Sequence, residues 1–284
     1  MGLTRIAIVG AGIMGRGIAQ VAAQGGLETF LQDVDRAQLE NAGKAIRSNL
    51  QRAVEKKRLT QKEADAARER LRTTTELPEA AAEAEVVIEA VPERIHLKIE
   101  ILAELDQLCH PETILASNTS SLSITEMAAV TQRAPNVVGM HFFNPVPRMR
   151  LLEIVRALET SDETLRTAEA VGQLMGKETV VVRESPGFIT SRINALIGNE
   201  AFRMLEEGVA NAHDVDKALK LGLNHPMGPF ELVDLVGLDT RLSILEYLHR
   251  TLGDRFRPSP LLVQYVKAGR LGRKTGRGVY AYGS

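Results

Sequence analysis

Three glycines near the N-terminus constrain the fold of this 284-residue chain more than any other feature. Gly10, Gly12 and Gly15 follow a short apolar run at residues 6–9 and open an apolar-periodic segment at 18–23. This order predicts a strand, a glycine turn and a helix. In such a unit the first glycine allows a tight turn, the second lets the backbone approach a pyrophosphate, and the third lets the helix pack on the strand. A purely structural turn is the alternative, but the context favours a dinucleotide site formed by Gly10, Gly12, Ile13, Met14 and Gly15.

Asp33 indicates which dinucleotide would bind. This acid ends a second predicted strand, at residues 28–33, which follows the helix after the glycine turn. A carboxylate at that position accepts hydrogen bonds from the adenosine ribose hydroxyls and repels a 2′-phosphate. The sequence therefore predicts NAD as the cofactor rather than NADP.

The rest of the first two thirds alternates strand and helix patterns. Strands are expected at 86–90, 114–116, 137–140, 151–155 and 180–182, and helices between them include 94–108 and 164–175. This alternation predicts an α/β fold, a Rossmann-type doubly wound and mostly parallel sheet covered on both faces.

Residues 36–72 interrupt the alternation as an inserted helical hairpin. The segment is polar, alanine-rich and free of proline, and we expect two helices broken near Leu59–Thr60. It carries eleven basic and five acidic residues. A solvated helix face and a binding surface for an anionic substrate both remain possible explanations of that excess.

Beyond Ser185-Pro186-Gly187 the pattern is almost wholly helical, with apolar-periodic segments at 189–205, 215–221 and 230–252. We therefore expect a dinucleotide-binding domain at 1–184 and an all-α C-terminal domain at 185–284.

Composition excludes several classes of protein. The formal net charge of −1 gives no overall field that would attract nucleic acid or an anionic membrane. The single cysteine, Cys109, excludes a disulfide scaffold and fits a reducing compartment. The N-terminus lacks the features of a secretory signal, and no apolar stretch is long enough to span a membrane. We expect a soluble cytoplasmic protein without a metal site and without nucleic-acid or membrane partners.

His141 is the strongest candidate for proton transfer. It follows the apolar run 137–140 and precedes Phe142–Pro147, after which the chain returns through 151–155 with Glu153 inside an apolar pattern. A charged residue in a buried strand needs a partner. His141 and Glu153 can pair if their two strands lie side by side, as either a structural or a catalytic pair.

A polar run, Ser117 to Ser121, directly follows the expected strand 114–116. In open α/β sheets, ligands bind at the carboxyl ends of strands, so these side chains are candidate ligand contacts. A helix N-cap is the alternative, because Ser and Thr commonly cap helices.

Taken together, these segments make the chain resemble the L-3-hydroxyacyl-CoA dehydrogenase family nearly end to end, and its bacterial 3-hydroxybutyryl-CoA-specific members most of all. The segments that carry the resemblance are the glycine turn and residues 117–121, 139–147, 186–188, 226–231 and 272–276. The resemblance implies an oxidoreductase that converts L-3-hydroxyacyl-CoA, with a short acyl chain, to 3-ketoacyl-CoA with NAD+ in fatty acid or butanoate metabolism. It also implies a homodimer formed through the helical domain, which would close over the substrate.

The resemblance also assigns roles to individual residues. His141 matches the catalytic histidine, Glu153 its orienting glutamate, and Ser120 the serine that bonds the substrate oxygen. Residues that match the NAD site are Asp33, Glu93, Lys98, Asn144 and Lys274, and those that match the coenzyme A site are Asn49, Lys56 and Ser120.

The chain departs from the family at one position. Ser191 stands where the family usually has an asparagine, and Asn194 lies one helical turn further on nearly the same face. We include Ser191 among the catalytic candidates and keep Asn194 as the alternative. Two other functions stay open: a related NAD-dependent dehydrogenase of free 3-hydroxy or sugar acids, and a non-catalytic NAD-binding sensor.

Overall fold

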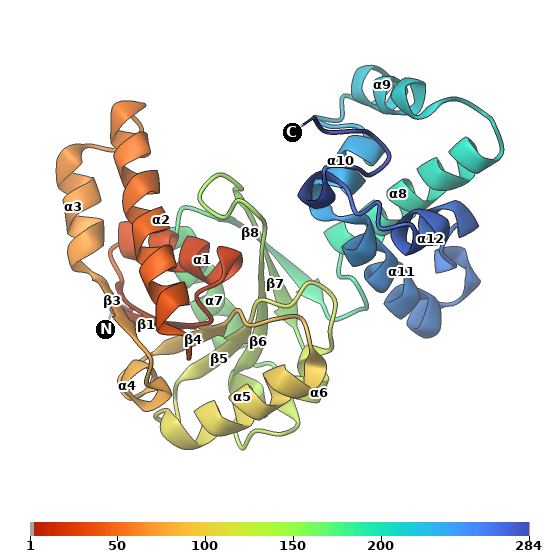
Figure 1. The fold of residues 1–284 in the computed structure, drawn as a ribbon. Helices are drawn as coiled ribbons and strands as arrows, with labels where there is room; N and C mark the ends of the chain where they lie inside the picture. Colours follow the sequence, from red (N-terminus) through yellow and green to blue (C-terminus); the bar gives the residue numbers. More distant parts are fainter. Residues whose placement is uncertain (1–2, 284) are drawn as a thin grey trace. The chain divides into compact units, whose positions relative to one another are not determined.

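The computed structural model describes residues 3–283, which divide between Glu184 and Ser185 into two compact units (Figure 1). No helix within these residues is long and apolar enough to cross a membrane.

The first unit is built on one eight-stranded sheet with the strand order β3-β2-β1-β4-β5-β6-β7-β8. All neighbouring strands are parallel except β6 and β7, which are antiparallel. The expected Rossmann-type fold is confirmed. The strands are β1 (Arg5–Val9), β2 (Glu28–Gln32), β3 (Leu71–Thr74), β4 (Val86–Glu89), β5 (Ile114–Ser117), β6 (Val137–Phe142), β7 (Leu151–Arg156) and β8 (Glu178–Arg183).

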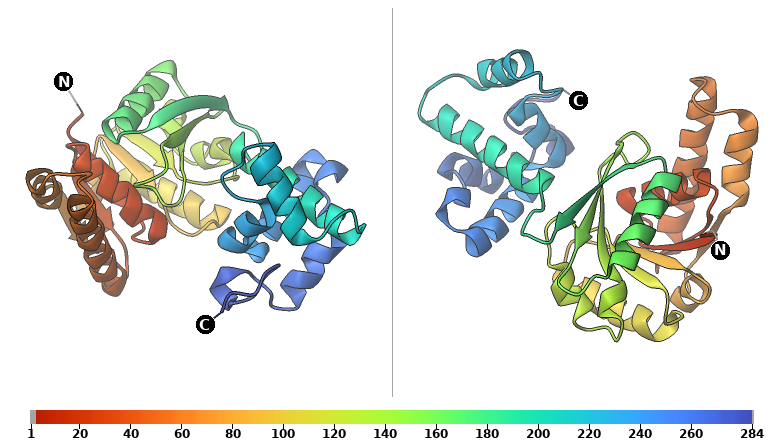
Figure 2. Two further views of the ribbon diagram at one scale, coloured as in Figure 1. Left: turned by 90° about the horizontal axis from the view of Figure 1, so that it is seen from above. Right: turned by 180° about the vertical axis from the view of Figure 1, so that it is seen from behind.

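Helices cover both faces of this sheet, and Figure 2 shows α7 and α5 on opposite sides of it. The helices of the unit are α1 (Ile13–Gln24), α2 (Arg36–Glu55), α3 (Gln61–Glu69), α4 (Leu77–Ala81), α5 (Ile95–Leu108), α6 (Ile124–Ala128) and α7 (Asp162–Leu174).

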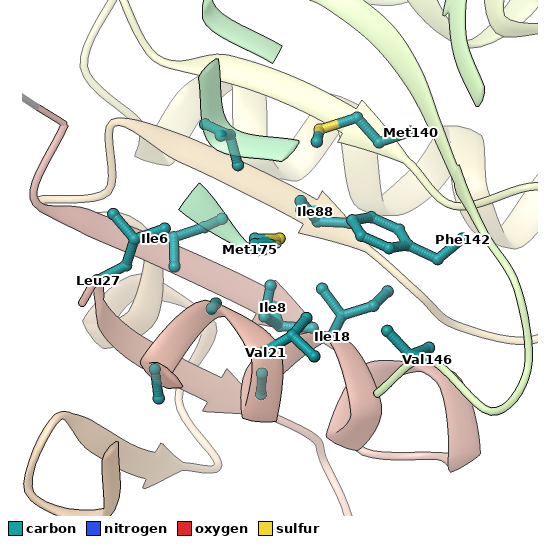
Figure 3. Packing of buried hydrophobic residues seen from close by; sticks show 14 of the residues in the cluster. Ile6, Ile8, Ile18, Val21, Leu27, Ile88, Met140, Phe142, Val146 and Met175 are labelled. Atoms are coloured by element: carbon teal, nitrogen blue, oxygen red, sulfur yellow. The ribbon is translucent and has the colours of Figure 1, made fainter. Parts of the chain in front are cut away.

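One hydrophobic cluster lies between the sheet and the helices α1 and α7, and residues of α2 and α3 extend it. Ile6 and Ile8 of β1 point to the same face because side chains alternate along a strand, and they pack with Ile18 and Val21 of α1 (Figure 3). All four are buried. Burying one side chain of this kind contributes about 1.5–3 kcal/mol, so this layer holds the glycine turn against the sheet.

The helical hairpin forms as two helices, α2 and α3, with local signals at each start. The Asp35 side chain accepts the N–H of Ala37 at the start of α2, and Thr60 forms a capping box with Glu63 at the start of α3. The expectation of helix up to residue 72 is wrong, because Leu71–Thr74 forms β3 and pairs with β2. Two β-branched threonines in this strand favour extended backbone, and pairing with β2 satisfies its hydrogen bonds.

The second unit is helical. Its α-helices are α8 (Thr190–Glu206), α9 (Ala212–Gly222), α10 (Pro229–Val236), α11 (Leu238–Leu252) and α12 (Pro260–Lys267). Residues 230–252 are not one continuous helix, as the apolar pattern suggested, because the chain breaks at Gly237. That residue has φ +108°, a conformation that glycine adopts without the steric cost of a side chain.

Candidate active site

The three glycines of the first turn each have a different structural role. Gly10 has φ +100°, and its N–H donates to Gln32 O of β2 at 2.7 Å. A Cβ on Gly15 would lie 1.7 Å from Gly10 O, so the helix approaches the turn more closely than any side chain permits. A Cβ on Gly12 would meet nothing within 4 Å.

That open surface at Gly12 fits a dinucleotide. Gly12 is the N-cap of α1 and provides no side-chain cap, so no side chain of the cap residue covers the N–H groups of the first turn. Such a helix start attracts phosphate through its N–H groups and its partial positive charge. Ile13 in this turn is exposed, whereas Met14 packs against the core. The turn can therefore hold the pyrophosphate of a bound dinucleotide.

Asp33 follows β2 and lies beside this turn. One carboxylate oxygen accepts the N–H of Ala11 at 2.7 Å, and the other accepts the N–H of Asp35 at 3.0 Å. The sequence indicated only a ribose contact for Asp33. The structure adds that the same carboxylate ties the end of β2 to the glycine turn.

His141 and Glu153 form a buried pair across the antiparallel strands β6 and β7. They are register partners, and Nδ1 of His141 lies 2.7 Å from Oε2 of Glu153. The hypothesis that the two side chains are partners is confirmed, although His141 lies within its strand rather than after it. A carboxylate at Nδ1 favours the tautomer with its proton there, so the lone pair lies on Nε2.

The polar run Ser117 to Ser121 forms a loop at the carboxyl end of the sheet. Ser117 ends β5 and donates its hydroxyl to Glu89 at 2.6 Å, and the N–H of Ser120 donates to Oε1 of Glu93 at 2.8 Å. The helix-cap alternative is wrong, since the residue that caps α6 is Ser123. Within residues 3–283 the Ser120 hydroxyl makes no hydrogen bond to the protein.

Lys98 is buried and its charge is balanced inside the protein. Its amine lies 2.7 and 2.9 Å from the two carboxylate oxygens of Glu89, at the end of β4, and 3.4 Å from Oε2 of Glu93. Sequence reasoning missed Glu89. Glu89 could have been identified from the sequence, because it is an acid at the end of an apolar strand. Asp33, which directly follows a strand, has nearly the same placement.

A cavity of about 440 Å³ brings the hairpin residues Asn49 and Lys56 together with the turn that follows Asn144. Its lining includes four basic side chains and no acidic one, a composition that suits a phosphate-bearing ligand. The other lining residues are Gln20, Gln24, Arg52, Ala53, Arg58, Leu59, Pro145, Pro147 and Arg148.

Lys177 holds the turn that lines this cavity. Its buried amine donates to Val146 O at 2.5 Å and to Met149 O at 2.9 Å. Burial lowers the pKa of Lys177. This contact could not be predicted from the sequence, because the lysine lies far along the chain from the turn.

The remaining candidates belong to the second unit. Lys274 pairs with Asp239, with Nζ 2.6 and 2.7 Å from its two oxygens. Burial alone would raise the pKa of Asp239, but hydrogen bonds from Lys274 and from the backbone of Thr240 hold it below its ordinary value. Ser191 and Asn194 both lie in the first turns of α8. Among residues 3–283, no group of three or more His, Cys, Asp or Glu side chains could hold a metal ion.

Two family models match the chain. That of the 3-hydroxyacyl-CoA dehydrogenase NAD-binding domain covers residues 5–185, and that of the C-terminal domain of the same family covers residues 187–282.

Individual proteins match over their full length. A probable 3-hydroxybutyryl-CoA dehydrogenase from Bacillus subtilis is 48% identical over 283 residues, which cover 99% of this chain and 98% of the relative. The crystal structure of (S)-3-hydroxybutyryl-CoA dehydrogenase from Ralstonia eutropha is similar with a TM-score of 0.96 and 44% identity, and covers 100% of both chains. The structure of FadB2 from Mycobacterium tuberculosis has a TM-score of 0.95 and 41% identity, again over 100% of both chains.

Proposed function

The chain belongs to the 3-hydroxyacyl-CoA dehydrogenase family, and we propose that it oxidises the 3-hydroxyl group of an L-3-hydroxyacyl-CoA to a ketone with NAD+. The observation that carries this function is the buried His141–Glu153 pair, 2.7 Å apart, in the sheet that also carries the glycine turn. A binding protein without catalysis has no need of an oriented proton acceptor. The pair therefore favours an enzyme over a sensor.

His141 acts as the general base. Its Nε2 takes the proton of the 3-hydroxyl group while the hydrogen on C3 leaves as hydride, and the C3–O bond becomes a carbonyl. NAD+, when bound, supplies the hydride acceptor. Glu153 holds the imidazole by its Nδ1 proton and stabilises the imidazolium that forms. A positioned base contributes about 10² to 10⁴ in rate.

Ser120 binds the reacting oxygen. Its hydroxyl makes no hydrogen bond among residues 3–283, and its backbone N–H is held by Glu93. A hydrogen bond from this hydroxyl keeps the substrate oxygen within reach of His141. Either Ser191 or Asn194, in the first turns of α8, supplies a further polar contact to the substrate in this proposal.

The cofactor is held by the first unit. The N-terminus of α1, at Gly10, Gly12, Ile13, Met14 and Gly15, would hold its pyrophosphate, and Asp33 would accept hydrogen bonds from its ribose hydroxyls. In this proposal Glu93 and Asn144 of the same unit would complete the site, and the buried Lys98 would act through Glu93, from which its amine lies 3.4 Å. The resemblance also assigns Lys274 of the second unit to the cofactor.

The coenzyme A portion lies in the cavity at Asn49 and Lys56. Support comes from the four basic side chains of its lining, which match the phosphates of coenzyme A. The relatives are named for 3-hydroxybutyryl-CoA, so a short acyl chain is the proposed substrate.

We propose a cytoplasmic homodimer. The single cysteine fits a reducing compartment. The second unit exposes apolar side chains that a partner subunit would cover, among them Val209, Leu221, Leu223 and Leu235.

One assay separates the candidate functions. NADH consumption is measured with acetoacetyl-CoA and, in parallel, with free acetoacetate at the same concentration. We expect turnover of the coenzyme A ester to be much faster. Equal rates would favour a dehydrogenase of free hydroxy acids, and NADH binding without turnover of either compound would favour a sensor.

A further inference from the structure

Strand β6 runs beyond the end of its neighbour β5. The parallel pairing of these two strands ends at Ser117 opposite Gly139. β6 continues to Phe142, with β7 paired along its other side as far as Leu152. Residues 140–142, which include His141, therefore have no β5 partner. A buried N–H on that side needs an acceptor from elsewhere.

The side chain of Asn118 supplies this acceptor. Its Oδ1 accepts the N–H of Phe142 at 2.9 Å, and its own backbone N–H donates to Glu89 O at 2.8 Å. Asn118 is buried, with 9% of its surface exposed. One residue thus joins the ends of β4, β5 and β6 at the point where β6 extends beyond β5.

The residues on either side of Asn118 are fixed from the β4 side. Ser117 bonds to the buried Glu89 carboxylate, which also accepts the N–H of Val91 at 2.7 Å. The N–H of Ser120 bonds to Glu93. These contacts hold the loop to β4 and to the segment after it, and none of them reaches β6. The bond between Asn118 and Phe142 ties this loop directly to the strand of His141.

We propose that Asn118 is a positioning residue that fixes the Ser120 loop to the strand of His141. It thereby sets the separation between the hydroxyl that binds the substrate oxygen and the base that takes the proton. This inference rests on the proposed function. Catalysis depends steeply on such separations, since a displacement of about 1 Å costs as much as 10²-fold.

The test removes the acceptor while keeping the branched shape and the number of heavy atoms of the side chain. In Asn118→Leu we expect kcat for reduction of acetoacetyl-CoA to fall by roughly 10- to 100-fold. The KM for NADH should stay within about threefold of the parent value, because the tie does not belong to the glycine turn. Asn118→Asp retains an acceptor oxygen, so its kcat should be at least about threefold higher than that of Asn118→Leu. If the leucine variant does not fold, Asn118→Ala removes the same acceptor without adding bulk.

Thr160 provides a matched control. It is also buried, accepts the N–H of Ala157 at 2.9 Å, and donates to Val137 O at the opposite end of β6. Thr160→Val also leaves a buried N–H without its acceptor, so it should lower Tm by a similar few degrees. Its kcat should stay within about twofold of the parent.

The outcomes separate the two proposals. An active parent with Asn118→Leu within about twofold of its kcat overturns the positioning role, as does Thr160→Val losing kcat to the same extent. A parent without any turnover of acetoacetyl-CoA overturns the proposed function itself, and the role of Asn118 with it.

Discussion

Asp33→Ala tests the cofactor site most directly, because it removes the expected ribose contact together with the backbone contacts to Ala11 and Asp35. The carboxylate is expected to accept ribose hydroxyls, and it already accepts the N–H of Ala11 in the glycine turn at 2.7 Å. A hydrogen bond to a charged group contributes about 1.5–3 kcal/mol. Loss of the ribose bond alone should therefore raise the Kd for NADH by roughly 10- to 100-fold, since about 1.4 kcal/mol is tenfold.

Because Asp33 also contacts the glycine turn, Asp33→Ala should change the affinities for NADH and NADPH by different amounts. Removal of the carboxylate abolishes its repulsion of the 2′-phosphate, but the loosened turn weakens pyrophosphate binding for both cofactors. We therefore expect the preference for NADH to narrow mainly because NADH binds less tightly. Asp33→Asn keeps one acceptor oxygen and should lose less NADH affinity than the alanine variant.

NADH fluorescence titration gives both Kd values, and kcat/KM with each cofactor gives the preference. The reasoning is refuted if the unaltered chain uses NADPH as efficiently as NADH. It is also refuted if Asp33→Ala binds NADH within about twofold of the parent.

Three further predictions concern other residues. His141→Gln should lower turnover by at least about 10² with little change in NADH affinity, and near-normal turnover would end the proposed mechanism. If the Ser191 hydroxyl replaces the family asparagine, Ser191→Ala should lower kcat/KM by about two- to twelvefold. If the Asn194 amide replaces it, Asn194→Ala should instead be the damaging change. Unchanged kcat/KM in both variants would show that neither residue has this role. The pKa of Asp239 is held below its ordinary value by Lys274, so this contact stabilises the fold above that ordinary value and is lost as pH falls through the lowered pKa. Lys274→Met should therefore lower Tm at pH 6, and the difference from the parent should shrink towards pH 3; a difference that grows in acid would contradict this.

The sequence predicted the parts of the fold that depend on local pattern. The glycine turn and the alternation of strands and helices follow from residue spacing, and the His141–Glu153 pair follows from a charge inside an apolar strand. β3 was missed because it is an edge strand of only four residues, and these do not alternate between buried and exposed side chains. Gly237 was missed as a break because a single glycine inside an apolar-periodic run does not by itself end a helix.

The missed site residues share a different cause. Glu89, Asn118 and Lys177 each act through contacts with segments far away in the chain. Glu89 could have been identified as an acid at the end of an apolar strand, but asparagine in a loop and lysine before a strand are ordinary residues, so only the folded arrangement shows the roles of Asn118 and Lys177. Asn118 is the clearest case, because its side chain accepts an N–H of β6 beyond the point where the backbone pairing of β5 with β6 ends.

The antiparallel pairing of β6 and β7 separates two kinds of evolutionary change. The register from Gly139 opposite Val155 to Phe142 opposite Leu152 fixes the base and its carboxylate, whatever the length of the connection between the strands. An insertion in that connection, which lines the cavity through Pro145 and Arg148, would reshape substrate recognition and leave the pair intact. A single-residue insertion inside β7 would instead turn Glu153 to the opposite face of the sheet. Substrate range can therefore diverge among descendants of this fold while the proton-transfer apparatus is inherited unchanged.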